Sequence, residues 1–286
     1  MQQQARTISG GEAAGARRHE SSGPRVPDGV RLVAVTLALM VVTGAAAAAR
    51  AQEVLLSVAI SLKDAAEELG REFQRTHPGV TLRYNVGASG ELQKQIEAGA
   101  PVDLFISAGQ KQIDDLEKQG LLRPGSRRVF ARNALTLIVP NDSRLDLRSP
   151  ADLLRPQVQR VVIGNPKTVP AGQYAEECLR TLGLWESLSP KIVFAENARQ
   201  ALEYVARGEV DAGFVYSTDA AMRAGRIKEA GRPPQESYAP VTYPGAIVAT
   251  SRHPALAQAF LDLLLGPAGQ QILARWGFQP PLGSSR

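Results

Sequence analysis

The chain has 286 residues, with 33 Lys or Arg against 28 Asp or Glu, and 44% of its residues are hydrophobic. Only 5% are aromatic and no Lys/Arg run follows residue 51, which argues against a nucleic-acid-binding protein. The single cysteine, Cys178, excludes an intramolecular disulfide, and the isolated His77 and His253 give no metal-ligand spacing.

Residues 1–51 have the arrangement of an export signal. A polar segment precedes an apolar run at 30–42, and residues 49–51 (Ala-Arg-Ala) show the small-x-small pattern of a cleavage site. The apolar run is too short to favour a membrane span. We expect secretion through the general (Sec) pathway, cleavage after Ala51 and a periplasmic protein. An uncleaved membrane anchor is the alternative, and translation that starts near Val30 fits the same segment.

Removal of this leader changes the charge of the chain. Residues 1–51 hold six basic and three acidic side chains, which leaves 27 basic and 25 acidic ones and a net charge of +2. The remaining segment of about 235 residues is long enough for two lobes or for one large α/β domain.

A strand-to-helix junction opens this segment. Residues 54–60 are apolar and rich in β-branched side chains, and helical spacing begins at Leu62. Ser61 stands at the junction, and Asp64 three residues later fits a capping box, in which both side chains accept backbone N–H groups of the first turn. A helix N-terminus of this kind can hold an oxyanion without a charged side chain, although an isolated serine there is ordinarily only a cap.

Strands and helices alternate along the rest of the chain. Further strands are expected at 79–85, 100–108, 133–140, 161–164, 191–194, 210–216 and 243–249. This alternation predicts parallel-rich α/β sheets with ligands at the carboxyl ends of the strands. If the last strand returns to the first sheet, the lobes are 52–132 plus 243–286 and 133–242, joined by a hinge of two crossings.

Four more junctions carry groups suited to an anion. Ser89 follows a Gly/Ala turn, Ala171 lies between Pro170 and Gly172, Ala198 follows the helix cap Asn197, and Tyr216 ends a strand. Each alone has a plain structural explanation as a turn, a cap or a packing side chain. Two other polar residues favour structural roles. Asp103 is expected to bind backbone N–H groups or a neighbouring Arg rather than to act as a catalytic acid, and Cys178 is expected in the core.

Taken in order, these junctions resemble a known family. The segments AISLKDA, GASGELQKQIEAGAPVDLFISA, VPAGQYA, AENARQALEYV and GFVYSTDA closely resemble the periplasmic molybdate-binding proteins of ABC importers, from about Glu53 to Phe278. The resemblance implies an α/β type II periplasmic binding protein whose two lobes close on a tetrahedral oxyanion. It also implies that the ligand is molybdate or tungstate and that the partner is the permease of an importer, which is the protein's only attachment to the membrane. The expected protein is a monomer that needs no cofactor, binds no nucleic acid and is not an enzyme.

The resemblance also assigns the ligand-binding residues. Ser61 and Ser89 match hydroxyl-and-amide ligands, Ala171 and Ala198 match backbone N–H ligands, and Tyr216 matches a phenol donor. These residues would hold molybdate or tungstate through its oxygens, with no direct metal ligand and no catalytic residue. Some relatives have a larger aliphatic residue at the position of Ala198, and relatives can carry a serine at the position of Gly90.

The chemistry of such a site limits its ligands. Molybdate, tungstate and sulfate carry no proton at neutral pH, so a site made only of donors accepts them, whereas hydrogen phosphate requires an acceptor. Sulfate is smaller than molybdate, so discrimination between the two depends on cavity size. A receptor for sulfate or another oxyanion is therefore one alternative. An exported α/β hydrolase is a weaker one, because neither serine has a histidine in a comparable motif and the chain has no G-x-S-x-G elbow.

Overall fold

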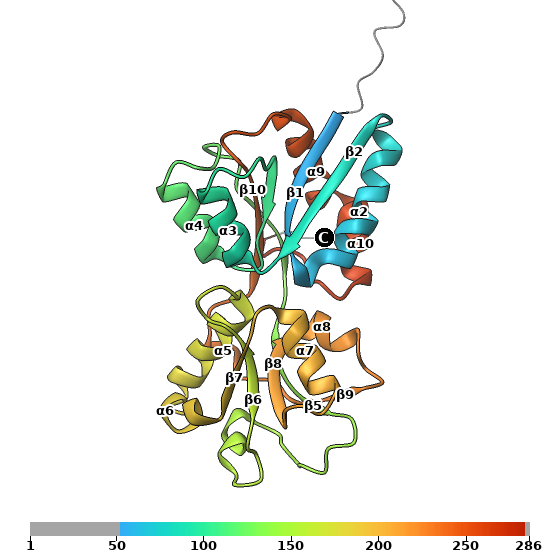
Figure 1. The fold of residues 1–286 in the computed structure, drawn as a ribbon. Coiled ribbons are helices and arrows are strands. Elements are labelled where there is room, and N and C mark those ends of the chain that lie inside the picture. The colour runs from blue at the N-terminus through green and yellow to red at the C-terminus, as the bar shows by residue number, and fades with distance from the viewer. Residues whose placement is uncertain (1–51, 284–286) are drawn as a thin grey trace, which may run out of the picture. The chain divides into compact units, whose positions relative to one another are not determined.

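The computed structural model describes residues 52–283, so the expected leader and its cleavage site lie outside the described residues (Figure 1). Within residues 52–283, no helix has the length and apolar character that a membrane span requires.

The first of two five-stranded sheets has the order β2-β1-β3-β10-β4. Its strands are β1 (Gln52–Ala59), β2 (Val80–Gly87), β3 (Leu104–Ile106), β4 (Arg128–Arg132) and β10 (Thr242–Ile247). Strand β1 runs parallel to β2 and β3, whereas β10 runs antiparallel to β3 and β4. Strand β1 has a neighbour on each side, and its residues 56–59 are buried, as its apolar sequence predicts.

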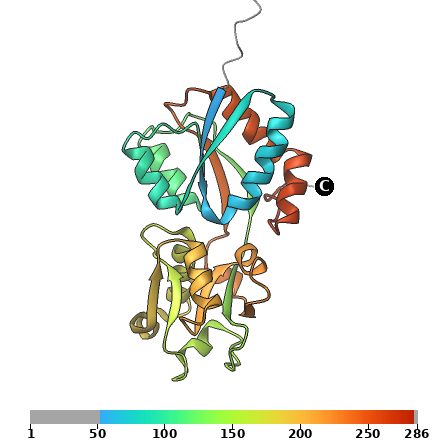
Figure 2. The ribbon, with the colours of Figure 1, turned by 45° about the vertical axis from the view of Figure 1, so that its right-hand side comes forward.

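Helices cover both faces of this sheet. They are η1 (Ile60–Leu62), α2 (Lys63–Thr76), α3 (Ser89–Glu97), α4 (Gln110–Lys118), α9 (Pro254–Leu265) and α10 (Pro267–Arg275). Helices α3 and α4 lie on one face, and α2, α9 and α10 lie on the other (Figures 1 and 2). Phe73 of α2 packs edge-on against Phe260 of α9, so the N-terminal and C-terminal segments share one core. We call this sheet with its helices the first lobe.

The second sheet has the order β7-β6-β8-β5-β9. Its strands are β5 (Leu135–Pro140), β6 (Val161–Gly164), β7 (Ile192–Ala195), β8 (Ala212–Tyr216) and β9 (Ile227–Gly231). Its helices are η2 (Pro150–Leu154), α5 (Pro170–Thr181), α6 (Trp185–Leu188), η3 (Ser189–Lys191), α7 (Ala198–Ala206), α8 (Ser217–Ala221) and η4 (Gln235–Ser237). We call this sheet with its helices the second lobe.

The chain passes between the sheets twice. It leaves the first sheet after β4 and enters β5 across residues 133–134, and it returns from β9 to β10 across residues 232–241. The expected architecture of two α/β lobes with two crossings is therefore confirmed. The lobe boundaries given above, 52–132 plus 243–286 and 133–242, stay a prediction at the level of single residues.

Two strands were not expected from the sequence. Strands β4 and β9 each lie at one edge of their sheet, and each pairs antiparallel with one neighbour. Lys228 and Glu229 of β9 are exposed, so this strand lacks the continuous apolar run of a central strand. Strand β3 covers only residues 104–106 of the expected 100–108.

Candidate oxyanion site between the lobes

One small cavity lies where helix N-termini of the two lobes meet. Its volume is about 10 Å³, and all five residues that the sequence singled out line it: Ser61, Ser89, Ala171, Ala198 and Tyr216. The first two come from the first lobe and the other three from the second. None of the residues that line this cavity has a charged side chain.

The helix positions of these residues explain what the cavity offers. Ser89 and Ala198 are the first residues of α3 and α7, Ser61 and Ala171 are the second residues of η1 and α5, and Tyr216 immediately precedes α8. Backbone N–H groups in the first turn of a helix have no partner within the helix and carry its positive partial charge. The cavity is thus surrounded by hydrogen-bond donors without any formal positive charge.

Glycines allow the helix ends to approach so closely. A Cβ atom on Gly172 would lie 1.8 Å from the carbonyl oxygen of Gly164, at the end of β6. Only glycine at position 172 therefore permits the first turn of α5 to pack against that strand, and this packing sets the position of the Ala171 N–H group.

Both serine hydroxyls have a hydrogen-bond partner within the protein. The Ser61 Oγ atom lies 2.9 Å from the Tyr243 hydroxyl, and the Ser89 Oγ atom accepts a hydrogen bond of 3.0 Å from the N–H group of Ala108. Both serines are buried, with relative exposures of 6% and 1%. Because the Ser89 oxygen accepts, the Ser89 hydroxyl proton is available to a ligand in the cavity.

The predicted capping box at Ser61 is wrong. Helix α2 begins at Lys63 after the 3₁₀ turn η1, and no side chain caps either segment. Asp64 instead forms an ion pair with Arg199 of α7, with 2.6 Å between oxygen and nitrogen. A charged partner on the other lobe binds this carboxylate in place of the local backbone N–H groups.

Tyr216 keeps its phenol in the donor form. It is 1% exposed, and its hydroxyl donates a hydrogen bond of 3.1 Å to the carbonyl oxygen of Ala108 in the first lobe. Burial, together with the charge of nearby Asp219, raises the pKa of Tyr216 well above its ordinary value. The group therefore stays protonated at physiological pH and remains a donor.

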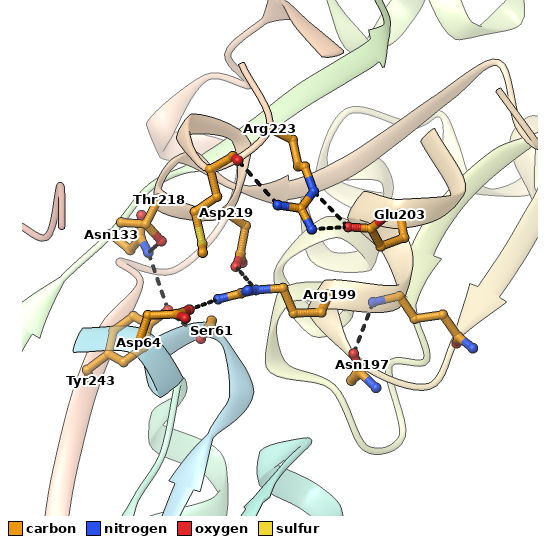
Figure 3. Close-up of polar contacts among 12 residues, drawn as sticks. Ser61, Asp64, Asn133, Asn197, Arg199, Glu203, Thr218, Asp219, Arg223 and Tyr243 are labelled. Carbon is orange, nitrogen blue, oxygen red and sulfur yellow. Dashed lines mark hydrogen bonds and ion pairs between the residues drawn. The ribbon is translucent and has the colours of Figure 1, made fainter. Parts of the chain in front are cut away.

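An ion network lies beside the cavity (Figure 3). Arg199, the neighbour of Ala198, contacts Asp64 on the first lobe and Asp219 on the second, the latter at 3.3 Å. Burial raises the pKa of Asp219 to about 6, although the charge of Arg199 opposes this. Burial alone would lower the pKa of Arg199, but its hydrogen bond to Asp64 and the charge of Asp219 raise it.

The lobes are in contact next to the cavity. The Gly90 N–H group donates a hydrogen bond of 2.8 Å to the Thr168 carbonyl oxygen of the second lobe. A Cβ atom on Gly90 would lie 2.7 Å from that oxygen and from the Thr168 Cα atom. With the lobes at this distance, a serine at position 90 would require the backbone of one lobe to move.

The other polar residues singled out in the sequence serve the structure. One Asp103 oxygen accepts from the Ser251 hydroxyl and from two backbone N–H groups, so the expected structural role is confirmed. Cys178 is fully buried, as expected, and its sulfur accepts from the Ser237 hydroxyl. Asn197 caps α7 by accepting from the Gln200 N–H group at 3.0 Å, also as expected.

Sequence reasoning missed the residues beneath the cavity. Tyr243 of β10 contacts Ser61, and Asn133 contacts Tyr243. A buried tyrosine signals the need for a hydroxyl partner. The partner itself could not be read from the sequence, because Ser61 and Tyr243 are 182 positions apart.

Comparison with known proteins places this site in context. Residues 54–279 match the model of a family described as bacterial extracellular solute-binding protein. The molybdate-binding protein ModA of Escherichia coli is 36% identical over 231 residues, which cover 79% of this chain and 88% of that protein.

Solved structures agree with this match. The periplasmic molybdate-binding protein of Azotobacter vinelandii superposes with a TM-score of 0.72 and 28% identity, covering 80% of this chain and 99% of that one. The sulfate-binding protein SubI of Mycobacterium tuberculosis H37Rv shares the fold, with a TM-score of 0.73 and 20% identity over 82% of this chain and 88% of its own.

Proposed function

We propose, since the chain belongs to the family of bacterial extracellular solute-binding proteins, that it captures molybdate or tungstate in the periplasm and delivers it to the permease of an ABC importer. In this proposal the leader directs export and is removed after Ala51. The mature protein is a monomer, which needs no cofactor and reaches the membrane only through the permease.

The observation that carries the proposal is the donor-only cavity. Helix N-termini and hydroxyl groups surround it, and no carboxylate, lysine or arginine lines it. A dianion without a proton can satisfy such donors, whereas an anion with a proton would place that proton against another donor. In a site shielded from water, these hydrogen bonds to a charged ligand are stronger than in solvent.

In the proposed complex, five residues hold the oxyanion through its oxygens. Ser61 and Ser89 supply hydroxyl and backbone N–H groups, Ala171 and Ala198 supply backbone N–H groups, and Tyr216 supplies its phenol. A cavity of about 10 Å³ holds about one water molecule, so a tetrahedral oxyanion requires these groups to move outward. The hydrogen bond from Tyr216 to Ala108 crosses between the lobes and is one that the ligand would replace.

The same cavity argues against an exported hydrolase. A hydrolytic serine needs a general base within hydrogen-bonding reach. Within residues 52–283, the two serine hydroxyls have as hydrogen-bond partners the phenol of Tyr243 and the backbone N–H group of Ala108. Neither group accepts a proton at neutral pH, which favours a binding role.

Calorimetric titration of the purified protein with molybdate, tungstate, sulfate and phosphate tests the proposal. We expect dissociation constants for molybdate and tungstate in the micromolar range or below, and much weaker binding of phosphate. Binding of sulfate without molybdate would reassign the ligand to the smaller oxyanion. Turnover of ester or phosphoester substrates in a parallel screen would contradict a pure binding role.

A further inference from the structure

A chain of buried hydrogen bonds runs beneath the cavity to Ser61 (Figure 3). The Asn133 amide nitrogen lies 3.3 Å from the Tyr243 hydroxyl oxygen, and that oxygen lies 2.9 Å from the Ser61 Oγ atom. Tyr243 is fully buried and Asn133 is 7% exposed. The three residues belong to distant parts of the chain and meet only in the fold.

The direction of this chain is fixed at its far end. The Ala134 N–H group donates to the Asn133 Oδ1 atom at 2.9 Å, so that oxygen is the acceptor of the amide and the nitrogen faces the other way. The same nitrogen also donates to the Thr218 hydroxyl at 2.9 Å. Asn133 is therefore a donor toward Tyr243, and the phenol oxygen accepts.

The Tyr243 hydroxyl proton then has one hydrogen-bond acceptor within reach among the described residues. Burial raises the pKa of Tyr243 above its ordinary value, so the group keeps its proton at physiological pH. A buried O–H group without an acceptor is costly. Ser61 is the partner within reach in the described part of the chain, so Tyr243 donates to the Ser61 oxygen and the serine proton points to the cavity.

The ring of Tyr243 is held in place on two sides. Its centroid lies 5.1 Å from that of Phe278, in an edge-to-face arrangement, and 5.9 Å from that of Tyr216. The aromatic contacts fix the ring, and Asn133 fixes the proton. Ser89 reaches the same state by a simpler route, since its oxygen accepts the Ala108 N–H group.

We propose that Tyr243, aligned by Asn133, is a positioning residue that holds the Ser61 hydroxyl as a donor and thereby makes the site selective for tetrahedral oxyanions that carry no proton. This inference rests on the proposed function, because it assigns a ligand to the cavity. Without the relay, the Ser61 oxygen becomes free to accept a hydrogen bond from the O–H group of an anion such as hydrogen phosphate, so the discrimination between ligand classes weakens.

A double-mutant cycle measured by calorimetry tests the relay. Ser61→Ala is expected to weaken molybdate binding at least about tenfold, and Tyr243→Phe about fivefold to tenfold, because each removes a buried hydrogen bond in the donor chain. If Tyr243 acts through Ser61, adding Tyr243→Phe to the Ser61→Ala variant weakens binding by less than about twofold. Equal effects of Tyr243→Phe in both backgrounds, or no effect in the parent, would overturn the proposal.

The selectivity between molybdate and phosphate is a second readout, and a mere loss of packing around Tyr243 would not change it. In Tyr243→Phe the ratio of molybdate affinity to phosphate affinity should fall, whereas Tyr84→Phe should leave it unchanged. Tyr84 is a matched control, because its hydroxyl donates to the carbonyl oxygen of Ala66 in α2, away from the cavity. An unchanged ratio in Tyr243→Phe contradicts the proposal. If this variant does not fold, Asn133→Ala, which retains the phenol, replaces it in the same cycle.

The parent protein separates this inference from the proposed function. If it binds sulfate but not molybdate, the proposed cargo is wrong, and the same cycle with sulfate still tests the relay. If it binds none of the four oxyanions, both proposals fail.

Discussion

At the scale of single residues, Asp219 shows how burial changes the chemistry of a carboxyl group. It is 0% exposed, one oxygen faces Arg199, and the other has no hydrogen-bond partner among residues 52–283. Burial raises its pKa from 3.8 to about 6. Arg199 lowers this value, whereas Asp64 adds to the rise, and the carboxylate in turn raises the pKa of Tyr243.

The raised pKa of Asp219 predicts a pH dependence of stability. The folded protein binds this proton more tightly than the unfolded chain, so the stabilising contribution is complete below about pH 4 and is lost as the pH rises through about 6. Between these pH values, the free energy of unfolding of the Asp219→Asn variant, measured with urea, should change by up to about 3 kcal/mol less than that of the parent protein.

An exposed carboxyl group is the control for that measurement. Asp142→Asn, in a loop of the second lobe, should leave the pH profile unchanged. If Asp219→Asn retains the full slope of the parent protein, Asp219 does not titrate in this range.

At the scale of secondary-structure elements, the site depends on where helices begin. Each junction of a strand with a helix is a local feature, since small residues, prolines and caps lie within a few positions of one another. For this reason the sequence identified the five positions that line the cavity, and Asn197 was correctly read as a cap. Their role as ligands stays a prediction.

Features that depend on distant residues were not predictable in this way. The capping box failed because Asp64 pairs with Arg199, 135 positions away. Strands β4 and β9 were missed because charged residues flank or interrupt their apolar residues, so neither has a continuous apolar run. Tyr243 was placed in a strand but not beneath the cavity, since its contact with Ser61 arises from the return of β10 to the first sheet.

Adding one methyl group at position 172 tests whether the site requires the close packing of α5 on β6. Gly172→Ala places a Cβ atom against the Gly164 carbonyl oxygen, so α5 must shift. We expect a loss of about 1–3 kcal/mol in the free energy of unfolding. Ligand affinity should also fall, because the N–H group of Ala171 moves with the helix.

Gly225→Ala is a suitable control for this substitution. A Cβ atom at position 225 meets no atom within 4 Å, and urea unfolding of this variant should match that of the parent. If Gly172→Ala and Gly225→Ala have the same stability and affinity, the close approach of α5 does not set the site.

At the scale of the whole described chain, contacts between the lobes hold the cavity closed. The ion pair of Arg199 with Asp64, the hydrogen bond from Gly90 to Thr168 and that from Tyr216 to Ala108 all connect the first lobe to the second. A ligand that binds only when the lobes meet gains affinity from the contacts between the lobes that remain around it, whereas the hydrogen bond from Tyr216 is one that it would replace.

The ion pair between the lobes predicts a modest effect on affinity. Asp64 and Arg199 are 31% and 20% exposed, so solvent screens their attraction, and the pair is worth about 0.2–1 kcal/mol. Asp64→Asn should therefore weaken molybdate binding by up to about fivefold and shift the ligand-free protein toward an open form in small-angle X-ray scattering.

The matched control removes an ion pair within one lobe. Glu53→Gln breaks the contact with Arg83 between β1 and β2 and should change neither the scattering nor the affinity. Equal affinities of Asp64→Asn and the parent protein would show that this pair does not contribute to closure.

The division of the donors between the two lobes has a consequence for unloading. Ala171, Ala198 and Tyr216 lie on one lobe and the two serines on the other, so separation of the lobes withdraws three of the five proposed ligand positions together. None of the five proposed ligand positions carries a fixed charge that would retain the anion at either half. A permease that pulls the lobes apart would thus release the cargo in a single mechanical step, without any need to compete for it chemically.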